Sequence, residues 1–222
     1  MSTLKDVTHY VIGGGPVGRA TLRQLVDSGV SPTLISRSRR ETIDAGAQIV
    51  GAIGDADVQD QINDGSVLYH CANAPYHRWV EELPALWDSV LEVAIRKRCR
   101  LVVATNLYAY GKPDGEITES HTKHPHTRKG VLRKEIESKI IDAVKTGQTQ
   151  AILVRGSDFF GPEVNDSAIG NRFFSSLIRG KQPVFTGAVD QPHSYTYLPD
   201  FGRTMIAAAE KLTSGTHDDE SS

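Results

Sequence analysis

Three glycines with the spacing Gly-x-Gly-x-x-Gly follow a short apolar run near the N-terminus. This spacing is typical of loops that bind the pyrophosphate of a dinucleotide. The first glycine permits a tight turn, the second lets the phosphates approach the backbone, and the third lets a helix pack closely on a strand. The first turn of that helix offers free N–H groups and a partial positive charge to the phosphates. The predicted contacts of this loop with a cofactor are Gly13, Gly15, Pro16, Val17 and Gly18.

The segment after the next predicted strand selects between the two common nicotinamide dinucleotides. Sites for NAD place an Asp or Glu there, which holds the 2′-hydroxyl of the adenosine ribose. Here Ser36 and Arg37 begin a basic segment that has no acid before Glu41. Since arginine pairs well with a 2′-phosphate, we predict NADP(H) rather than NAD(H), with Arg37 as the leading contact and Ser36 or Arg39 assisting. A solvated basic loop is the alternative interpretation.

The elements that must position these residues follow an alternating pattern. Short β-branched runs alternate with longer amphipathic stretches, which predicts βαβ units and a parallel sheet covered on both faces. Strands are predicted at 7–12, 33–36, 48–51, 66–71, 101–104 and 151–155, and helices at 16–28, 79–98 and 130–145. The expected fold is α/β, a Rossmann-like doubly wound parallel sheet in the order 3-2-1-4-5-6, with the site at the carboxyl ends of the strands.

The pattern becomes less regular after residue 156. We predict a helix at 173–178, a short strand at 183–185 and a helix at 201–212. The chain is therefore expected to form one NAD(P)-binding domain over residues 1–212, with substrate-side insertions at about 156–198. The last residues, 213–222, are polar, and we predict a disordered tail there.

Composition excludes several other classes of protein. The 222 residues hold 25 Lys and Arg against 27 Asp and Glu, a net charge of 25 − 27 = −2, which argues against a nucleic-acid partner. Two cysteines, Cys71 and Cys99, make no disulfide framework and favour a reducing, cytoplasmic location. No apolar run is long enough for a membrane span, and the histidines at 121–126 match no zinc spacing, so we expect neither a membrane partner nor a metal.

Five motifs, in order along the chain, resemble the NAD-dependent epimerase/dehydratase group of the extended short-chain dehydrogenases/reductases. They are Asp55 after the third predicted strand and the segments 70–74, 105–111, 155–162 and 193–201. The resemblance implies that Asp55 contacts the adenine. It also implies a reduced C-terminal substrate region, since members of this group continue further, and a possible homodimer through the helices at 79–98 and 130–145. By resemblance, further cofactor contacts are Ala72, Asn73, Thr105, Gly156 and Ser157, and substrate contacts are Asp158, His193 and Tyr195.

The chain departs from this family at the residues that carry its chemistry. The family uses a Ser or Thr, followed on the next helix by Tyr-x-x-x-Lys. Asn106 stands at the Ser position, and aligning Glu135 with the family's Glu puts Thr127 at the Tyr and Val131 at the Lys. We therefore predict Tyr108 as the proton donor and Asn106 as a hydrogen-bond donor to the substrate oxygen. A Tyr108 that only shapes the site is the alternative.

Three functions remain open at this point. The leading hypothesis is an enzyme, an NADP(H)-dependent oxidoreductase of the carbonyl reductase or dehydrogenase type that acts on a small carbonyl or hydroxyl compound. The alternatives are a non-catalytic NADP(H)-binding or sensor protein, and an epimerase, isomerase or lyase that uses the same site. Residues 121–134 also hold five Lys and Arg and no acid. They form either a solvated surface or a positive rim that attracts a phosphorylated or carboxylated ligand.

Overall fold

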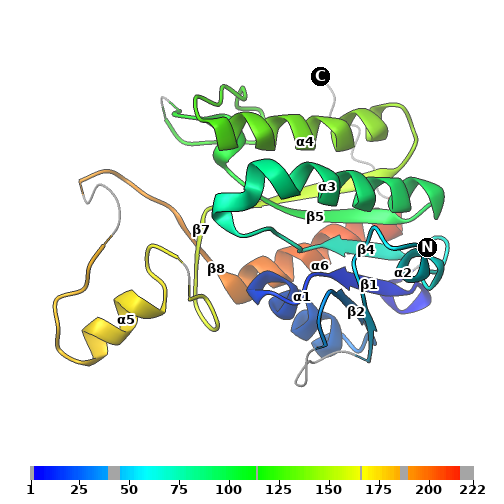
Figure 1. Ribbon diagram of the computed structural model, residues 1–222, viewed down its shortest axis with the longest axis horizontal. Coiled ribbons are helices and arrows are strands. Elements are labelled where there is room, and N and C mark those ends of the chain that lie inside the picture. Colours follow the sequence, from blue (N-terminus) through cyan, green and yellow to red (C-terminus); the bar gives the residue numbers. More distant parts are fainter. Residues whose placement is uncertain (1–2, 40–45, 114, 166, 186–189, 216–222) are drawn as a thin grey trace.

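A six-stranded parallel sheet forms the centre of the protein (Figure 1). The computed structural model describes residues 3–39, 46–113, 115–165, 167–185 and 190–215. The strand order is β3-β2-β1-β4-β5-β6, which confirms the predicted Rossmann-like topology. The strands are β1 (His9–Ile12), β2 (Thr33–Ser36), β3 (Ala47–Val50), β4 (Val67–His70), β5 (Arg100–Asn106) and β6 (Gln150–Gly156).

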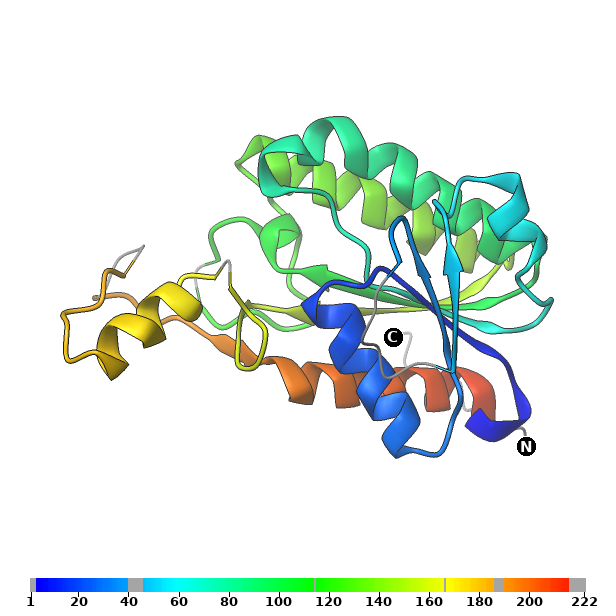
Figure 2. The ribbon, with the colours of Figure 1, turned by 60° about the horizontal axis from the view of Figure 1, so that its bottom comes forward.

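Helices cover both faces of this sheet (Figure 2). One face carries α1 (Pro16–Asp27) and α6 (Leu198–Ser214), and the other carries α3 (Trp79–Arg96) and α4 (Arg128–Lys145). Shorter helices are α2 (Ala56–Asp60) and the single turns η1 (Leu4–Asp6), η2 (Tyr76–Arg78) and η3 (Tyr108–Tyr110). Helix α3 ends two residues earlier than predicted because Arg98 takes a positive φ of 49°, which no helix can continue.

The central strands are buried on both faces, as their uninterrupted apolar sequences predict. Neighbouring residues of a strand point to opposite faces and so join different cores. Leu68 and Leu101 pack toward α3 and α4, whereas Val67 and Val102 pack toward α1 and α6. The strands are thereby held between two apolar layers, and only their ends are left for binding and chemistry.

The C-terminal part differs from the prediction in three places. No strand forms at 183–185, where Val184 is exposed and no described strand lies alongside. Instead β7 (Asp158–Phe160) and β8 (Tyr195–Tyr197) pair as a separate parallel ribbon. Helix α6 continues to Ser214, so the predicted tail begins too early, and residues 216–222 lie outside the described part. The predicted helix at 173–178 is confirmed as α5 (Asn171–Ile178), which stands away from the sheet in Figures 1 and 2.

Two of the three motif glycines are required by close packing. A Cβ atom on Gly18 would lie 1.8 Å from the carbonyl oxygen of Gly13. Gly13 itself has a φ of +105°, and a Cβ atom there would lie 2.6 Å from the Cα atom of Ala72. Helix α1, the glycine loop and the loop after β4 are therefore packed backbone against backbone, which no side chain would permit.

We expect the substitution Gly18→Ala to lower the free energy of unfolding by about 2 kcal/mol or more, because backbone must shift to admit the methyl group. Gly15→Ala is the matched control. Its φ is −77°, and its Cβ would meet nothing within 4 Å, so we expect a loss of about 1 kcal/mol or less. Urea unfolding at equilibrium measures both variants, and equal losses would contradict the packing argument.

Candidate functional site

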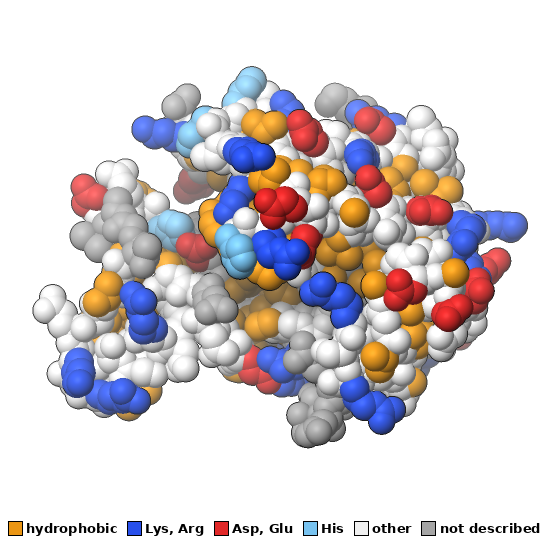
Figure 3. Space-filling view, viewed as in Figure 1, with side chains coloured by type: hydrophobic (Ala, Val, Ile, Leu, Met, Phe, Trp, Pro, Cys, Tyr) orange, Lys and Arg blue, Asp and Glu red, His pale blue; other side chains and the backbone are white. Residues whose placement is uncertain are grey.

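The loops that follow β1, β4, β5 and β6 meet at the carboxyl edge of the sheet. These four strands are neighbours. Ile12 ends β1 beside His70 at the end of β4, whereas β5 and β6 continue three residues beyond Val103, the partner of His70, and end side by side at Asn106 and Gly156. Ligands of doubly wound sheets bind at this edge. Figure 3 shows the surface hollowed between α1 and the part of the molecule that carries α3, with hydrophobic side chains inside the hollow.

The glycine loop leaves room for a phosphate where the motif predicts one. Gly15 is the N-cap of α1, and the space in front of its Cα is open, since an added Cβ would meet nothing within 4 Å. Pro16 and Val17 form the first turn of α1, whose N–H groups face that space. The N–H of Gly13 donates to the carbonyl of Ile35 at 2.9 Å, which fixes the loop to β2. The loop therefore fits the pyrophosphate of a dinucleotide.

The residues after β2 are arranged differently from the prediction. Ser36 is buried, its hydroxyl donates to the Ser38 carbonyl at 2.7 Å, and it accepts from Gln48 Nε2 at 2.8 Å. This hydroxyl therefore stabilises the loop. Arg37 is exposed. An exposed guanidinium can bond to ribose hydroxyls or stack on adenine as well as pair with a phosphate, so Arg37 alone does not select NADP(H).

Asp55 stands at the N-cap of α2, beyond the end of β3. It is exposed, and its Oδ2 atom accepts from the backbone N–H of Ala52 at 2.9 Å. The hydrogen bond fixes the direction of the carboxylate next to the strand ends, where the resemblance expects an adenine contact.

Tyr108 belongs to an aromatic cluster beside Asn106. Its ring lies 5.7 Å from Trp79 and 6.4 Å from Tyr76, and its hydroxyl donates to the Tyr76 hydroxyl at 3.5 Å. The backbone N–H of Tyr108 donates to Asn106 Oδ1 at 3.1 Å, so the two predicted residues are linked directly. Partial burial, followed by this bond to Tyr76, raises the pKa of Tyr108 above its usual range.

The register of helix α4 distinguishes two glutamates that bear on the predicted alignment. Glu135 is exposed, whereas Glu137, two residues on, is completely buried. Thr127 is the N-cap of α4, and its hydroxyl accepts from the N–H of Gly130 at 3.0 Å. Val131 is exposed as well. Thr127 and Val131 are therefore a helix cap and a surface residue.

Aligning the buried Glu137 with the family's Glu moves the assignment by two residues. Lys129 then stands at the Tyr position and Arg133 at the Lys position, so the Tyr-x-x-x-Lys pair is absent in either alignment. Sequence reasoning missed this because only burial distinguishes the two glutamates. The residues missed with it are Tyr76, Trp79 and Arg133, and the signal that could have found them is the helical spacing of Gly130, Arg133 and Glu137 on one buried face.

Glu137 joins three elements beneath the site. Its Oε1 atom accepts from the Thr105 hydroxyl, and its Oε2 atom accepts from Lys123 and Arg155, each at 2.8 Å. Burial alone would raise the pKa of Glu137, but the charge of Arg155 and these hydrogen bonds outweigh it and hold the pKa below its usual range. The hydroxyl of Thr105, a predicted cofactor contact, donates to Glu137 on α4.

Arg133 lies one turn before Glu137 and is 3% exposed. Its Nη2 atom donates to Asn73 Oδ1 at 3.2 Å, and its guanidinium lies 4.2 Å from the centre of the Trp79 ring. Asn73, a predicted cofactor contact, is exposed at the loop after β4. Ala72, its neighbour, packs under Gly13. The loop after β4 therefore connects the glycine loop to α4.

The three predicted substrate residues lie together on the β7–β8 ribbon and the loop before β8. His193 Nε2 is 3.0 Å from Asp158 Oδ2, and the His193 ring lies 4.7 Å from the ring of Tyr195. The backbone N–H of Ser157 donates to the Thr196 hydroxyl at 2.9 Å, which attaches this ribbon to the end of β6. Gly156 is buried under the ring of Phe159.

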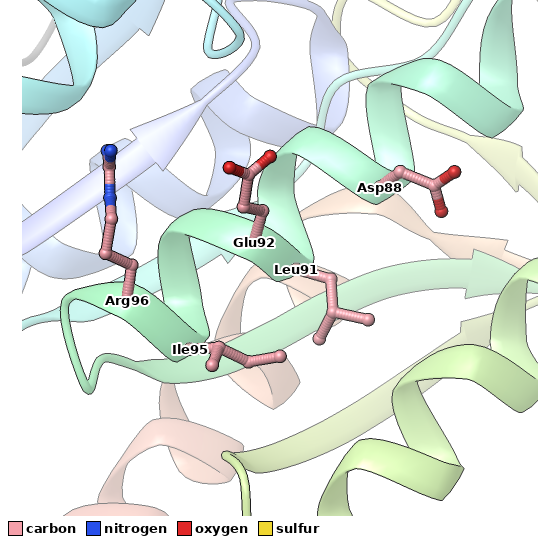
Figure 4. A pocket seen from close by; sticks show the side chains of 5 residues that line it. All are labelled: Asp88, Leu91, Glu92, Ile95 and Arg96. Atoms are coloured by element: carbon pink, nitrogen blue, oxygen red, sulfur yellow. The ribbon is translucent and has the colours of Figure 1, made fainter.

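Other surface features lie apart from this edge. A depression of about 500 Å³ on the outer face of α3 is lined by Asp88, Leu91, Glu92, Ile95 and Arg96 (Figure 4). It belongs to a helix surface and contains none of the predicted site residues. Within the described ranges, no three His, Cys, Asp or Glu side chains gather where a metal ion could bind. Nor does any helix in the described part have the length and apolar character needed to cross a bilayer.

The fold and the glycine loop define a dinucleotide-binding α/β protein. The chain belongs to the NAD dependent epimerase/dehydratase family, whose model matches residues 9–220. No curated protein matches it.

Solved structures with the same fold include several sugar-nucleotide enzymes. MoeE5, in complex with UDP-glucose and NAD, is 22% identical with a TM-score of 0.75, over 96% of this chain and 73% of its own. UDP-N-acetylglucosamine 4-epimerase from Bacillus cereus is 20% identical with a TM-score of 0.78, over 91% of this chain and 71% of its own. UDP-glucose 4-epimerase from Brucella ovis, in complex with NAD, is 17% identical with a TM-score of 0.78, over 94% of this chain and 74% of its own.

These comparisons correct the predicted cofactor. The family is named for NAD, and MoeE5 and the Brucella ovis enzyme hold NAD. The prediction of NADP(H) was therefore wrong. It rested on Ser36 and Arg37, and the structure shows the first engaged within its own loop and the second exposed.

We expect Glu137→Gln to lower the free energy of unfolding at pH 7 by about 3 kcal/mol, because Lys123 and Arg155 lose their buried counter-charge. The depressed pKa means that the carboxylate stabilises the fold fully above its unfolded-state pKa, near about 4.3, and less as pH falls through the lower folded-state pKa. The difference in the free energy of unfolding between the wild type and Glu137→Gln should therefore become smaller below about pH 4. Urea unfolding at several pH values measures it.

Asp88→Asn provides the comparison for this experiment. Asp88 pairs with Lys139 at 2.6 Å, but both side chains are about half exposed. Its loss should cost less than about 1 kcal/mol. A Glu137→Gln variant as stable as Asp88→Asn at pH 7 would contradict the role given to the buried carboxylate.

Proposed function

We propose that the protein binds NAD(H) and transfers hydride between this cofactor and a small carbonyl or hydroxyl compound. The observation that carries the proposal is the open space at Gly15, at the carboxyl end of β1 and the N-terminus of α1. A phosphate could approach the backbone N–H groups there, because an atom added at the Cβ position of Gly15 would meet nothing within 4 Å. Family membership and the NAD named in two of the similar structures support the same cofactor.

The residues along the strand ends fit the remaining parts of NAD. Asp55 and Arg37 would accept and donate hydrogen bonds at the adenosine end, and both are exposed there. Asn73, after β4, would lie toward the nicotinamide end. When bound, the cofactor supplies a ring carbon that accepts or gives a hydride.

Asn106 and Tyr108 would act on the substrate oxygen. The Asn106 side chain holds the backbone of Tyr108 through its Oδ1 atom, which leaves its amide N–H₂ to donate to a substrate oxygen. Because the pKa of Tyr108 is raised, its phenol keeps its proton near neutral pH. It can then protonate the oxygen as hydride reaches the adjacent carbon, which leaves a phenolate that takes a proton back from solvent.

An epimerase-type reaction is the second candidate, and family membership favours it. In such a reaction one bound substrate is oxidised and then reduced, so NADH does not accumulate. The same oxygen contact serves both half-reactions. Absorbance at the NADH band distinguishes the candidates. A dehydrogenase produces NADH in proportion to product, and an epimerase forms product without it.

Gly15→Ala tests cofactor binding. We expect NAD to bind at least about tenfold more weakly, because the new methyl group occupies the space through which the phosphates approach. Isothermal titration calorimetry with NAD measures this. Gly115→Ala is the control, since Gly115 has the same open surroundings without a place in the loop. Failure of the wild-type protein to bind NAD would overturn the proposed function.

Tyr108→Phe tests the proton donor. We expect the rate of hydride transfer to fall at least about 30-fold with NAD affinity nearly unchanged, because the variant loses only the phenolic hydroxyl and keeps the ring. Tyr197→Phe is the matched control, an equally exposed tyrosine (both 39%) at the end of β8. Single-turnover reduction of a substrate carbonyl by NADH measures the step. If Tyr108→Phe transfers hydride at the wild-type rate, Tyr108 is not the proton donor and only shapes the site.

A further inference from the structure

The basic segment at 121–134 separates into paired and unpaired cations in the structure. Lys123 pairs with Glu137, and the Lys134 ammonium donates to the Lys123 carbonyl at 3.0 Å. Lys129 and Arg133 differ from these. Within the described part of the chain, no carboxylate lies within 4.0 Å of either one.

Arg133 is a buried cation without an ion-pair partner in the described part of the chain, and burial lowers its pKa to about 10 although the charge of Glu137 opposes this. Its Nη2 atom has the Asn73 amide oxygen, and its Nε atom is buried without a hydrogen-bond partner. His70, whose pKa is lowered to about 3 by burial and by the charge of Arg133, is neutral at physiological pH. A buried charge without a counter-ion is costly, and such a residue in a protein usually has a partner. The partner expected here is an anion that is not part of the chain.

The nearby acids are occupied by other bases. Glu137, four residues further along α4, takes hydrogen bonds from Lys123, Arg155 and Thr105. Asp158, which influences Tyr108 electrostatically, is 3.0 Å from His193. Neither carboxylate therefore forms an ion pair with Arg133, although the charge of Glu137 acts on it from a distance.

Lys129 extends this region toward solvent. It lies one helical turn before Arg133 and therefore on the same side of α4. Its ammonium is 2.9 Å from the centre of the Tyr76 ring and 5.7 Å from that of Trp79. Tyr76 is 55% exposed and Tyr108 39%, and their rings contact one another. The partly exposed Lys129, Tyr76 and Tyr108 thus lie against the buried Trp79, which in turn contacts the buried Arg133, next to Asn73 and Asn106.

We propose that Arg133 and Lys129 bind an oxyanion of the substrate, a carboxylate or a phosphate ester, against the rings of Tyr76, Trp79 and Tyr108. This inference rests on the proposed function, because that function puts the reacting carbon beside Asn106 and Tyr108. A guanidinium can donate two parallel hydrogen bonds to such a group, and burial strengthens them. The substrate class is therefore a small anionic alcohol or carbonyl compound, such as a hydroxy acid, an oxo acid or a phosphorylated sugar.

Tryptophan fluorescence reports on this site directly. The chain has two tryptophans, Trp79 and Trp87, and their rings lie 4.2 and 5.5 Å from the Arg133 guanidinium. The probes are oxalate and inorganic phosphate, with oxamide as the neutral analogue of oxalate, each titrated with and without saturating NAD. We expect a saturable change with at least one anion and none with oxamide. Oxalate and phosphate together separate a carboxylate site from a phosphate site.

Three variants locate the binding. Arg133→Gln should weaken anion binding at least about tenfold and Lys129→Gln at least about threefold, because each removes a charge-assisted hydrogen bond. Lys145→Gln, an exposed lysine in the last turn of α4, should bind as the wild type does. Circular dichroism shows whether Arg133→Gln folds. If it does not, the anion affinity of Lys129→Gln, compared with that of Lys145→Gln, tests the proposal. The proposal is overturned if neither oxalate nor phosphate gives a saturable change in fluorescence. It is also overturned if Lys129→Gln and Lys145→Gln bind the anion with equal affinity.

Calorimetry with NAD separates this inference from the proposed function. Arg133→Gln and Lys129→Gln should change NAD affinity by less than about threefold, because the glycine loop holds the phosphates of the cofactor. If Arg133→Gln loses NAD affinity and anion affinity equally, Arg133 binds the cofactor. That result would overturn the proposal that Arg133 binds the substrate anion. If the wild-type protein binds oxalate or phosphate as expected but does not bind NAD, the proposed anion site stands and the proposed function is overturned.

Discussion

The buried carboxylate of Glu137 is the constraint on which the candidate site depends. It accepts hydrogen bonds from β5, from β6 and from the segment that precedes α4. These bonds fix α4 over the carboxyl ends of the two strands, and they determine which face of α4 carries Lys129 and Arg133. A helix held by apolar contacts alone could rotate or slide by a fraction of a turn, whereas charged hydrogen bonds with defined directions fix its register.

A second constraint acts on the cofactor side. Gly13 and Gly18 bring α1, the loop after β1 and the loop after β4 into backbone contact. The loop after β4 carries Asn73, which accepts from Arg133, so the two constraints meet at one hydrogen bond. The edge of the sheet is therefore a connected structure in which the phosphate-binding loop and the cations of α4 have a fixed relation.

The sequence predicts the fold well and the chemistry only in part. Strand order and the glycine loop follow from strong local patterns, the apolar β-branched runs and the spacing of three glycines. The register of α4 does not follow from a local pattern, because Glu135 and Glu137 are the same residue type and only their burial distinguishes them. The choice of cofactor failed for a similar reason, since an arginine after β2 has several hydrogen-bonding uses and its presence does not specify a 2′-phosphate. The pairing of β7 with β8 joins residues 37 positions apart, such as Asp158 and Tyr195, which no local pattern indicates.

The placement of α5 bears on how such a protein can diversify. No residue of α5 is buried, and Ile178 is 85% exposed, so this segment adds nothing to either apolar core. Insertions, deletions and substitutions there leave the sheet and the glycine loop intact. Sequence changes in α5 can therefore accumulate while the sheet and its glycine loop are preserved, so related chains can diverge in this segment without loss of the folded core.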